Sequence, residues 1–361
     1  MTTHGVTIDR QTGGVRPIDT IAGAAIGLLA SCSLVSTEGK LLLMQSAKDV
    51  TDADDGTGTL TAAMNMIRKH SNAPVVVVAV DPSHVADAHG NASTFTLGFR
   101  LLQAESELGV RPAILAQNLV GHVEDDLISI GNKLGATVHL DGPNTNDAAA
   151  VSGVATHSST RAEYHDPAIV DDSDNVVGAS VAAAAIASTL NFWESASNKV
   201  VLGIKKLSRP ISWAQGDATS QAQLLNDAKV GTIIRSNSGY RLWGGLTTGA
   251  DAQLKFLCVT RTDDVIAKSI QEAFLWAVDM GITKTFVEDV LESVNAFLRD
   301  LKARGAIVDG RAWADKALNS PTSIALGNLY IDYDFTPVYP AYAITMRRHL
   351  TNQYLTQLFA A

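Results

Sequence analysis

The sequence predicts a mixed α/β protein, in which an α/β core domain with a mixed sheet flanked by helices is joined by a small additional domain and by extended N- and C-terminal arms. Three observations predict this fold class. Short β-branched runs alternate with helical patterns in the first half of the chain. A hairpin pattern around a Ser-Asn-Ser-Gly turn follows in the second half. Segments at both ends carry β-branched or aromatic residues with no evident strand partner in their own domain.

The first half of the chain alternates predicted strands and helices. Residues 41–44 form a short apolar run, residues 59–69 place apolar side chains at helical spacing, and residues 75–80 form a continuous β-branched run typical of a buried strand. The later elements are, in order, a strand at 113–115, a helix at about 122–134, a strand at 137–140, a helix at 177–193 and a strand at 199–204. Strands separated by helices indicate a largely parallel sheet.

The second half changes character after residue 230. The hairpin comprises residues 232–234 and 240–243, and we expect a third strand at 256–260. Two helices follow, and the second carries one continuous apolar stripe from residue 286 to residue 301, with Thr285 and Glu288 at capping-box spacing. Period-2 alternation then predicts strands at 329–335 and 342–346.

Composition excludes several protein classes. The 361 residues suffice for about two domains. Charged residues make up only 18% of the chain, below the roughly 25% usual for soluble domains, which suggests a surface partly covered by partners. The net charge of −9 disfavours direct nucleic-acid binding, which usually needs a basic face. No apolar run approaches the roughly 20 residues of a membrane-spanning helix, so we expect no membrane insertion.

The two cysteines, Cys32 and Cys258, are too far apart in sequence to suggest a disulfide framework or a zinc knuckle. Cys258 lies in the strand expected at residues 256–260, where cysteine acts as a small hydrophobic residue. No secretory leader is visible. We therefore expect a soluble protein made in a reducing cytoplasm.

Nothing in the sequence forms a complete catalytic, cofactor or metal site. The nine histidines do not gather into a ligand set; the closest approach is Asp81, His84 and His89, for which a solvated loop is the better interpretation. His165 and Asp166 before Pro167 do not by themselves establish general-base geometry.

Two segments resemble catalytic loops only in part. Residues 54–59, Asp-Asp-Gly-Thr-Gly-Thr, lead into a helix but lack the Lys-Ser/Thr ending of a phosphate-binding loop, and their carboxylates would repel a phosphate. A flexible loop with Thr59 as helix N-cap is favoured. Residues 178–182 lack the second glycine of a nucleophile elbow. We therefore predict no enzyme, no catalytic residue, no cofactor and no metal ligand.

A series of short motifs carries more information than any single residue type. In order, they are Ser-Ala-Ser-Asn at 195–198, Leu-Ser-Arg-Pro-Ile at 207–211, Gly-Tyr-Arg-Leu-Trp-Gly at 239–244, Val-Thr-Arg-Thr-Asp-Asp at 259–264 and Thr-Pro-Val-Tyr-Pro-Ala at 336–341. In this order and spacing the chain resembles the contractile tail sheath proteins of bacteriophages, R-type bacteriocins and related injection particles. The sheath-core motif residues are Arg209, Pro210, Tyr240, Trp243 and Arg261.

The chain departs from that family's pattern at two points. Residues 245–247 are Gly-Leu-Thr, where the family often has Asn-Arg-Thr. The chain also leaves little room for the large surface domains that some sheaths insert, which implies a minimal sheath with a small outward-facing domain. The resemblance implies an N-terminal arm at 1–20, an α/β sheath domain at 21–195, a C-terminal sheath core domain at 196–340, and a C-terminal arm and tail at 341–361.

The resemblance implies a structural function in a virion tail sheath. Subunits stack as rings around an inner tail tube, and contraction drives the tube through the bacterial envelope for genome delivery without any cofactor. The implied partners are other copies of the chain, the tail tube protein, the baseplate and the tail terminator, with assembly in the host cytoplasm. Arm residues donate strands to neighbouring subunits and are expected to be Val6, Ile8, Tyr342, Ile344 and Met346.

Two other classes stay open at this point. An α/β enzyme with an unrecognised active site would show a pocket of convergent titrating residues. Another self-assembling tail component, such as a tube protein, is expected to be smaller and rich in strands. The two long helices predicted between residues 265 and 304 argue against a tube protein.

Overall fold

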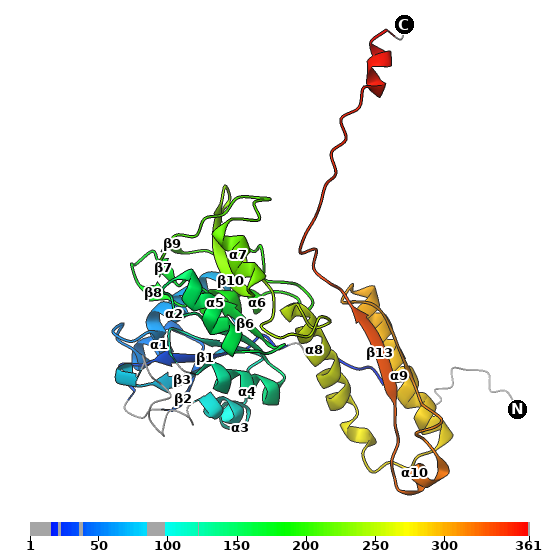
Figure 1. The fold of residues 1–361 in the computed structure, drawn as a ribbon. Coiled ribbons are helices and arrows are strands. Elements are labelled where there is room, and N and C mark those ends of the chain that lie inside the picture. The colour runs from blue at the N-terminus through cyan, green and yellow to red at the C-terminus, as the bar shows by residue number, and fades with distance from the viewer. Residues whose placement is uncertain (1–15, 21–22, 36–38, 85–97, 122, 360–361) are drawn as a thin grey trace, which may run out of the picture.

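The computed structural model describes residues 16–20, 23–35, 39–84, 98–121 and 123–359. A large layered α/β part is joined through the helix α8 (Leu257–Ala273) to a smaller part made of helices and a strand pair. The C-terminal segment then extends away from both parts (Figure 1). The mixed α/β class predicted from the sequence is confirmed.

The large part contains an eight-stranded mixed sheet with the order β11-β10-β6-β5-β4-β1-β3-β2. Its central strands run parallel, while the edge strands β2 and β11 pair antiparallel with β3 and β10. The strands are β1 (Ile26–Ser31), β2 (Leu41–Met44), β3 (Val75–Val80), β4 (Ile114–Gln117), β5 (Thr137–Asp141), β6 (Ala162–His165), β10 (Val230–Ser236) and β11 (Gly239–Trp243). This sheet crosses the domain division expected after residue 195.

Helices cover both faces of the sheet, which is why β1 and β3 are apolar and buried along their whole length. One face packs against α2 (Leu60–His70) and α6 (Ala179–Ala187). The α6 helix consists mostly of alanine and is buried throughout, so its short side chains let it lie close to the sheet. The opposite face packs against α4 (Glu124–Leu134), with α3 (Ala104–Leu108), α5 (Asp147–Thr156) and α7 (Gln221–Asp227) beside it.

Smaller elements complete the large part. A three-stranded sheet contains β8 (Val176–Val177), β7 (Ile169–Asp171) and β9 (Ile204–Leu207) in that order. The short helices are α1 (Ala47–Ala53), η1 (Pro82–His84) and η3 (Gly98–Gln103).

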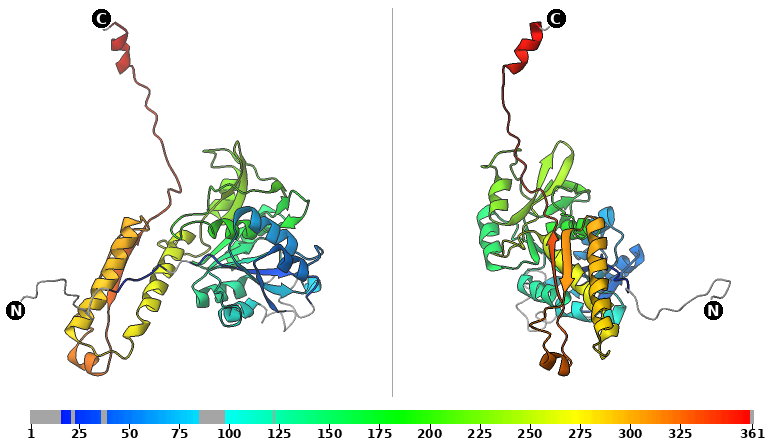
Figure 2. Two further views of the ribbon diagram at one scale, coloured as in Figure 1. Left: turned by 180° about the vertical axis from the view of Figure 1, so that it is seen from behind. Right: turned by 90° about the vertical axis from the view of Figure 1, so that its right-hand side faces the viewer.

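The smaller part consists of α9 (Lys284–Ala303) packed on the antiparallel pair β12 (Ile307–Trp313) and β13 (Asp332–Pro337). The short helices η4 (Leu275–Ala277) and α10 (Pro321–Ala325) complete it, whereas η5 (Gln353–Phe359) lies at the far end of the C-terminal segment. Figure 2 shows α9 lying along the strand pair and the C-terminal segment leaving in one direction.

A second connection between the two parts comes from the segment before β1, of which residues 16–20 and 23–24 are described. The Arg16 backbone N–H donates to Ser293 Oγ of α9 (3.1 Å). Arg304, at the C-terminal end of α9, donates to Thr20 Oγ1 (2.8 Å). The Arg16 guanidinium also lies 3.8 Å from the centre of the Trp276 ring. Gly23 then accepts a hydrogen bond from Arg261 of α8 (3.4 Å), just before β1 begins.

Several predicted elements differ in the structure. The strand expected at residues 256–260 is wrong, because α8 begins at Leu257 with Phe256 as its N-cap; a short apolar run does not distinguish a buried strand from a buried helix start. Cys258 is nevertheless buried. The helix expected at 177–193 spans only Ala179–Ala187. The strand expected at 199–204 lies instead at Ile204–Leu207.

At the start of α9, the cap is Thr283, whose hydroxyl accepts from the Phe286 N–H (3.1 Å), and not the predicted pair Thr285 and Glu288. Residues 342–346 form no strand within the described part of the chain and are exposed.

Candidate functional site

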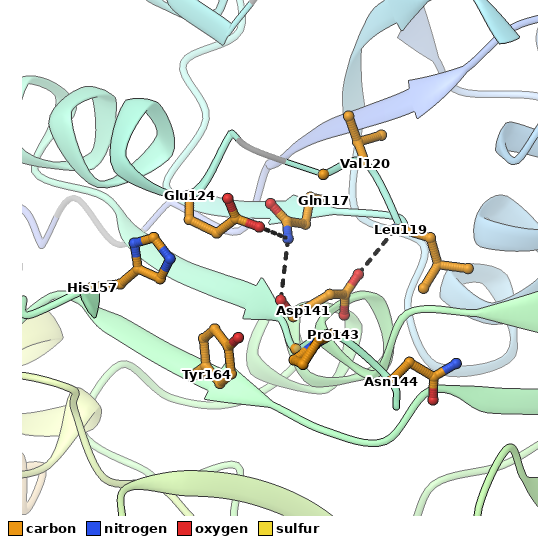
Figure 3. Close-up of a pocket in the computed structure, with 11 residues that line it drawn as sticks. Gln117, Leu119, Val120, Glu124, Asp141, Pro143, Asn144, His157 and Tyr164 are labelled. Carbon is orange, nitrogen blue, oxygen red and sulfur yellow. Dashed lines mark hydrogen bonds between the residues drawn. The ribbon is translucent and has the colours of Figure 1, made fainter. Parts of the chain in front are cut away.

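The carboxyl ends of parallel strands are where open α/β sheets usually bind ligands. At the ends of β4 and β5 the structure has a cavity of about 380 Å³, bordered by Glu124, His157 and Tyr164 (Figure 3). Gln117 donates there to Glu124 (3.3 Å), and the Leu119 N–H donates to Asp141 Oδ2 (3.0 Å). The Gln117 amide and the Asp141 carboxylate are therefore already bonded to groups of the protein.

Beside this cavity, side chains of the sheet cap the N-terminus of α6. Asp141 Oδ1 accepts from the Ser180 N–H (3.0 Å), and Asn118 Oδ1 accepts from the Gly178 N–H (2.9 Å). A Cβ atom at Gly178 would lie 2.0 Å from Asp141 Oδ2, so only glycine fits there. Burial raises the pKa of Asp141 to about 6. The N–H groups at a helix N-terminus can bind an anion. At α6 this place is taken by the carboxylate of Asp141.

The loop at residues 54–59 shows the same feature. Asp54, which is buried, accepts from the N–H groups of Gly58 and Thr61 at the start of α2, both at 2.9 Å. Its carboxylate occupies the place where a phosphate-binding loop would hold phosphate. Thr59 is the N-cap of α2, as predicted, but its hydroxyl makes no capping bond and instead accepts from the Ser31 N–H (2.9 Å).

Replacement of Asp54 by asparagine is expected to lower the free energy of unfolding by about 1–3 kcal/mol at neutral pH. Burial raises the pKa of Asp54, but hydrogen bonds from Ser33, Thr61 and Gly58 lower it more, so the net shift is downward. A carboxylate with a lowered pKa stabilises the fold above its unfolded pKa and loses that contribution as pH falls through its folded pKa.

The difference in free energy of unfolding between Asp54→Asn and the unaltered chain should therefore become smaller at acidic pH. Urea unfolding at several pH values measures this difference. Asp52→Asn, on the exposed side of the same segment, serves as the control and should change stability by less than about 0.5 kcal/mol. An equal loss at all pH values would contradict the assigned carboxylate contacts.

The motif residue Arg209 forms ion pairs with one buried and one partly exposed carboxylate. Its guanidinium contacts the carboxylates of Asp147 and Asp166, and the Asp166 side chain is completely buried. Asp166 also accepts from the Asn144 N–H (2.8 Å). Burial raises the pKa of Asp166 above its ordinary value even though Arg209 lowers it. Arg209 therefore connects the segment after β9 to the ends of β5 and β6.

The other motif residues lie in separate places. Trp243 of β11 packs edge-to-face with Trp213 at 5.7 Å between ring centres, and the Tyr240 hydroxyl donates to the Lys205 carbonyl (3.4 Å). Pro210 is exposed. Arg261 donates to the Ala187 carbonyl at the end of α6 (2.8 Å), and burial lowers its pKa to about 10. The structure therefore does not gather these residues into one site.

The arm residues differ in how they are held. The Tyr342 ring lies 5.7 Å from the Phe256 ring, whereas Ile344 is 74% exposed and Met346 is 89% exposed. Val6 and Ile8 lie outside the described residues, as does His89.

One cluster was missed by the sequence interpretation. His139 of β5 and Glu163 and His165 of β6 are all buried, and their side-chain atoms lie within 4.8 Å of one another. The sequence interpretation considers His165 only together with Asp166 and does not bring these three residues together. Side chains alternate between the two faces of a strand, so neighbours on adjacent strands cannot be found without the strand pairing; here the cluster becomes visible once β6 and its register with β5 are known.

Comparison with known proteins identifies the family. A family model described as the phage tail sheath C-terminal domain matches residues 250–351. A prophage major tail sheath protein of Pseudomonas aeruginosa (strain UCBPP-PA14) is 35% identical over 385 residues, which cover 98% of each chain. The chain belongs to the tail sheath protein family. The tail sheath protein of Escherichia phage P2 is 30% identical over 388 residues, covering 98% of this chain and 97% of that protein.

Solved structures show the same sheath fold. The helical sheath of the anti-feeding prophage in its contracted state aligns with a TM-score of 0.75 at 17% identity, covering 98% of this chain and 100% of that chain. The contracted sheath of the extracellular contractile injection system PVC aligns with a TM-score of 0.72 at 14% identity, covering 98% and 99%.

This sheath protein is a structural protein and not an enzyme. Its buried carboxylates and arginines accordingly hold elements together. Over the described residues, no helix has both the length and the apolar character that crossing a bilayer requires.

Proposed function

We propose that copies of this chain polymerise as stacked rings around an inner tail tube, and that contraction of this sheath drives the tube through a bacterial envelope for genome delivery. The observation that carries the proposal is the full-length similarity to tail sheath proteins, at 35% and 30% identity over 98% of the chain. Two of the structures with this fold are sheaths in the contracted state, which supports a contractile assembly.

Neighbouring subunits are proposed to exchange strands through their arms. The proposed donors are Val6, Ile8, Tyr342, Ile344 and Met346. Residues 338–352 are extended and lack a partner strand among the described residues. In addition, β12 and β13 form a two-stranded sheet, so each has one edge unpaired within the described chain. An exposed sheet edge accepts an added strand through main-chain hydrogen bonds.

The partners of the sheath follow from the same assembly. Besides other copies of the chain, we propose the tail tube protein inside the sheath, the baseplate at one end and the tail terminator at the other, with assembly in the host cytoplasm. One structure with this fold belongs to a baseplate, that of the anti-feeding prophage. The arms at 1–20 and 341–361 would connect subunits, while the regions 21–195 and 196–340 form the body.

Electron microscopy of the purified chain tests this assembly directly. Negative-stain images, with and without tube protein added, are expected to show hollow, striated cylinders, and light scattering should report very large particles. Only monomers at every salt and protein concentration, even with tube protein present, would contradict the proposal.

A further inference from the structure

The buried cluster beneath α6 has the arrangement of a metal site. In the parallel pair of β5 and β6, His139 lies opposite Glu163, and His165 follows two positions later. Residues two apart on a strand share a face, so the three side chains project together from one side of the sheet. Their exposed fractions are 0% for His139, 5% for Glu163 and 2% for His165.

The distances within the cluster fit one particular ion. His139 Nδ1 lies 3.2 Å from His165 Nε2, and Glu163 Oε2 lies 3.5 Å from each of these nitrogens. A tetrahedral zinc ion with bonds of about 2.0–2.1 Å holds its ligand atoms roughly 3.3 Å apart. We propose that His139, Glu163 and His165 bind a zinc ion in this sheath protein.

A shared proton accounts for the cluster less well than a metal ion does. One proton can link the two ring nitrogens, but Glu163 Oε2 then stays 3.5 Å from both, beyond the usual 2.7–3.2 Å of an N–H···O bond. Among the residues whose placement is described, these imidazoles are the only groups in ion-pair contact with the Glu163 carboxylate. A buried carboxylate needs a compensating charge, and a divalent cation supplies it.

The outward nitrogens of both rings support metal binding at the inward ones. His139 Nε2 and His165 Nδ1 have no hydrogen-bond partner among the described residues. No protein group therefore fixes either tautomer, and each ring can carry its proton outward and present a free electron pair to the centre. Two imidazoles and one carboxylate suit zinc, whereas magnesium and calcium prefer six or more oxygen ligands.

A small cavity borders two of the three proposed ligands, His139 and Glu163, and leaves room beside them for a fourth ligand. It has a volume of about 20 Å³ and is lined by His139, Glu163, Cys258 and Arg261. This is enough for one water molecule, which needs about 10–15 Å³. Two histidines, one glutamate and a water form a known zinc coordination set. Because Cys258 and Arg261 belong to α8, the ion would lie where the sheet meets the helix that leads to the smaller part.

The test is zinc uptake by the full chain during refolding, because the closed site gives an ion little access once the protein has folded. The chain is unfolded and refolded with Zn²⁺ or with EDTA, and bound metal is counted by plasma mass spectrometry. We expect one zinc ion per chain and a higher Tm after refolding with zinc. Refolding with Co²⁺ should give the intense visible bands of a tetrahedral site. Refolded protein without stoichiometric metal would overturn the proposal.

Glu163→Gln keeps the shape of the side chain and removes its charge. It should weaken zinc binding by about 100-fold or more, at least the loss seen when an outer-sphere partner is removed. His157→Gln is the matched control, because His157 pairs with Asp125 outside the cluster (2.8 Å), and its zinc binding should be unchanged. Equal zinc affinity of Glu163→Gln and the unaltered chain would also refute the site. If Glu163→Gln fails to fold, the metal count on the unaltered chain still decides, and neither measurement depends on sheath assembly.

Discussion

A chain truncated after Ala343 is expected to fold with an almost unchanged Tm and to form no sheaths. The truncation removes Ile344 and everything after it, side chains that are mostly exposed and contribute little to the fold of their own subunit. It keeps Tyr342, whose ring packs near Phe256 at 5.7 Å. Assembly should be lost because a donated strand supplies the main-chain hydrogen bonds between neighbours. Thermal unfolding and negative-stain imaging measure the two effects separately.

Single prolines sharpen this prediction. Ile344→Pro removes one backbone donor from the predicted strand at residues 342–346 and should weaken assembly if that N–H faces the neighbour. Leu350→Pro, in the exposed stretch beyond that strand, is the control and should assemble normally. Ordinary contractile sheaths from the truncated chain, or its unfolding as a monomer, would show that the segment is not an exchanged strand. At the other end, deletion should stop at residue 15, because Arg16 contacts Ser293 and Trp276.

Arg209→Met is expected to destabilise the subunit by about 3–5 kcal/mol at neutral pH, because it leaves a buried carboxylate without its cation. The Asp166 side chain is completely buried, and its pKa is already raised by burial. Loss of Arg209 removes the group that lowers this pKa, so the pKa rises further. The cost arises from keeping Asp166 ionised inside the protein, and urea unfolding measures it.

The pH dependence of this variant has a defined sign. A carboxyl group whose folded pKa exceeds its unfolded value of about 3.9 destabilises the fold above the folded pKa, and this cost disappears as pH falls toward the unfolded pKa. Arg209→Met should therefore recover part of its lost stability in mild acid. The double variant Arg209→Met/Asp166→Asn should recover most of it at neutral pH. No recovery in either case would mean that Arg209 stabilises through packing and not through Asp166.

The sequence predicted the elements whose patterns are long or locally determined. The apolar stripe of α9 and the hairpin of β10 and β11 were both predicted, since each depends on periodicity or turn residues within a short window. The apolar run at Phe256 was assigned to a strand because four apolar residues have no distinguishable period. Its helical state depends on packing between α8 and the two parts of the molecule, which local sequence does not contain.

The contacts of the site residues also depend on segments that are distant in the sequence, so the sequence alone does not predict them. Arg209 was singled out by its motif, but its partner Asp166 becomes visible only when the segment after β9 is folded against β6. The His139 cluster needs the register between β5 and β6, because a shift of one residue would turn His139 and His165 to opposite faces. The sequence interpretation considers Asp54 only as a charge that would repel phosphate, whereas the structure shows that its carboxylate accepts from the N–H groups at the start of α2.

Two parts of the chain lie between the large and small parts: the segment before β1 that includes residues 16–20 and 23–24, and α8. If the two parts were joined by one segment alone, the small part could rotate freely about that segment. The first link is held by the contacts of Arg16 and Thr20 with α9 and its end. The second is held by the hydrogen bonds from Arg261 to Gly23 and Ala187, so the two links together restrict the small part more than one would. A displacement of the small part relative to the eight-stranded body would therefore have to strain or break these contacts as well as bend the chain.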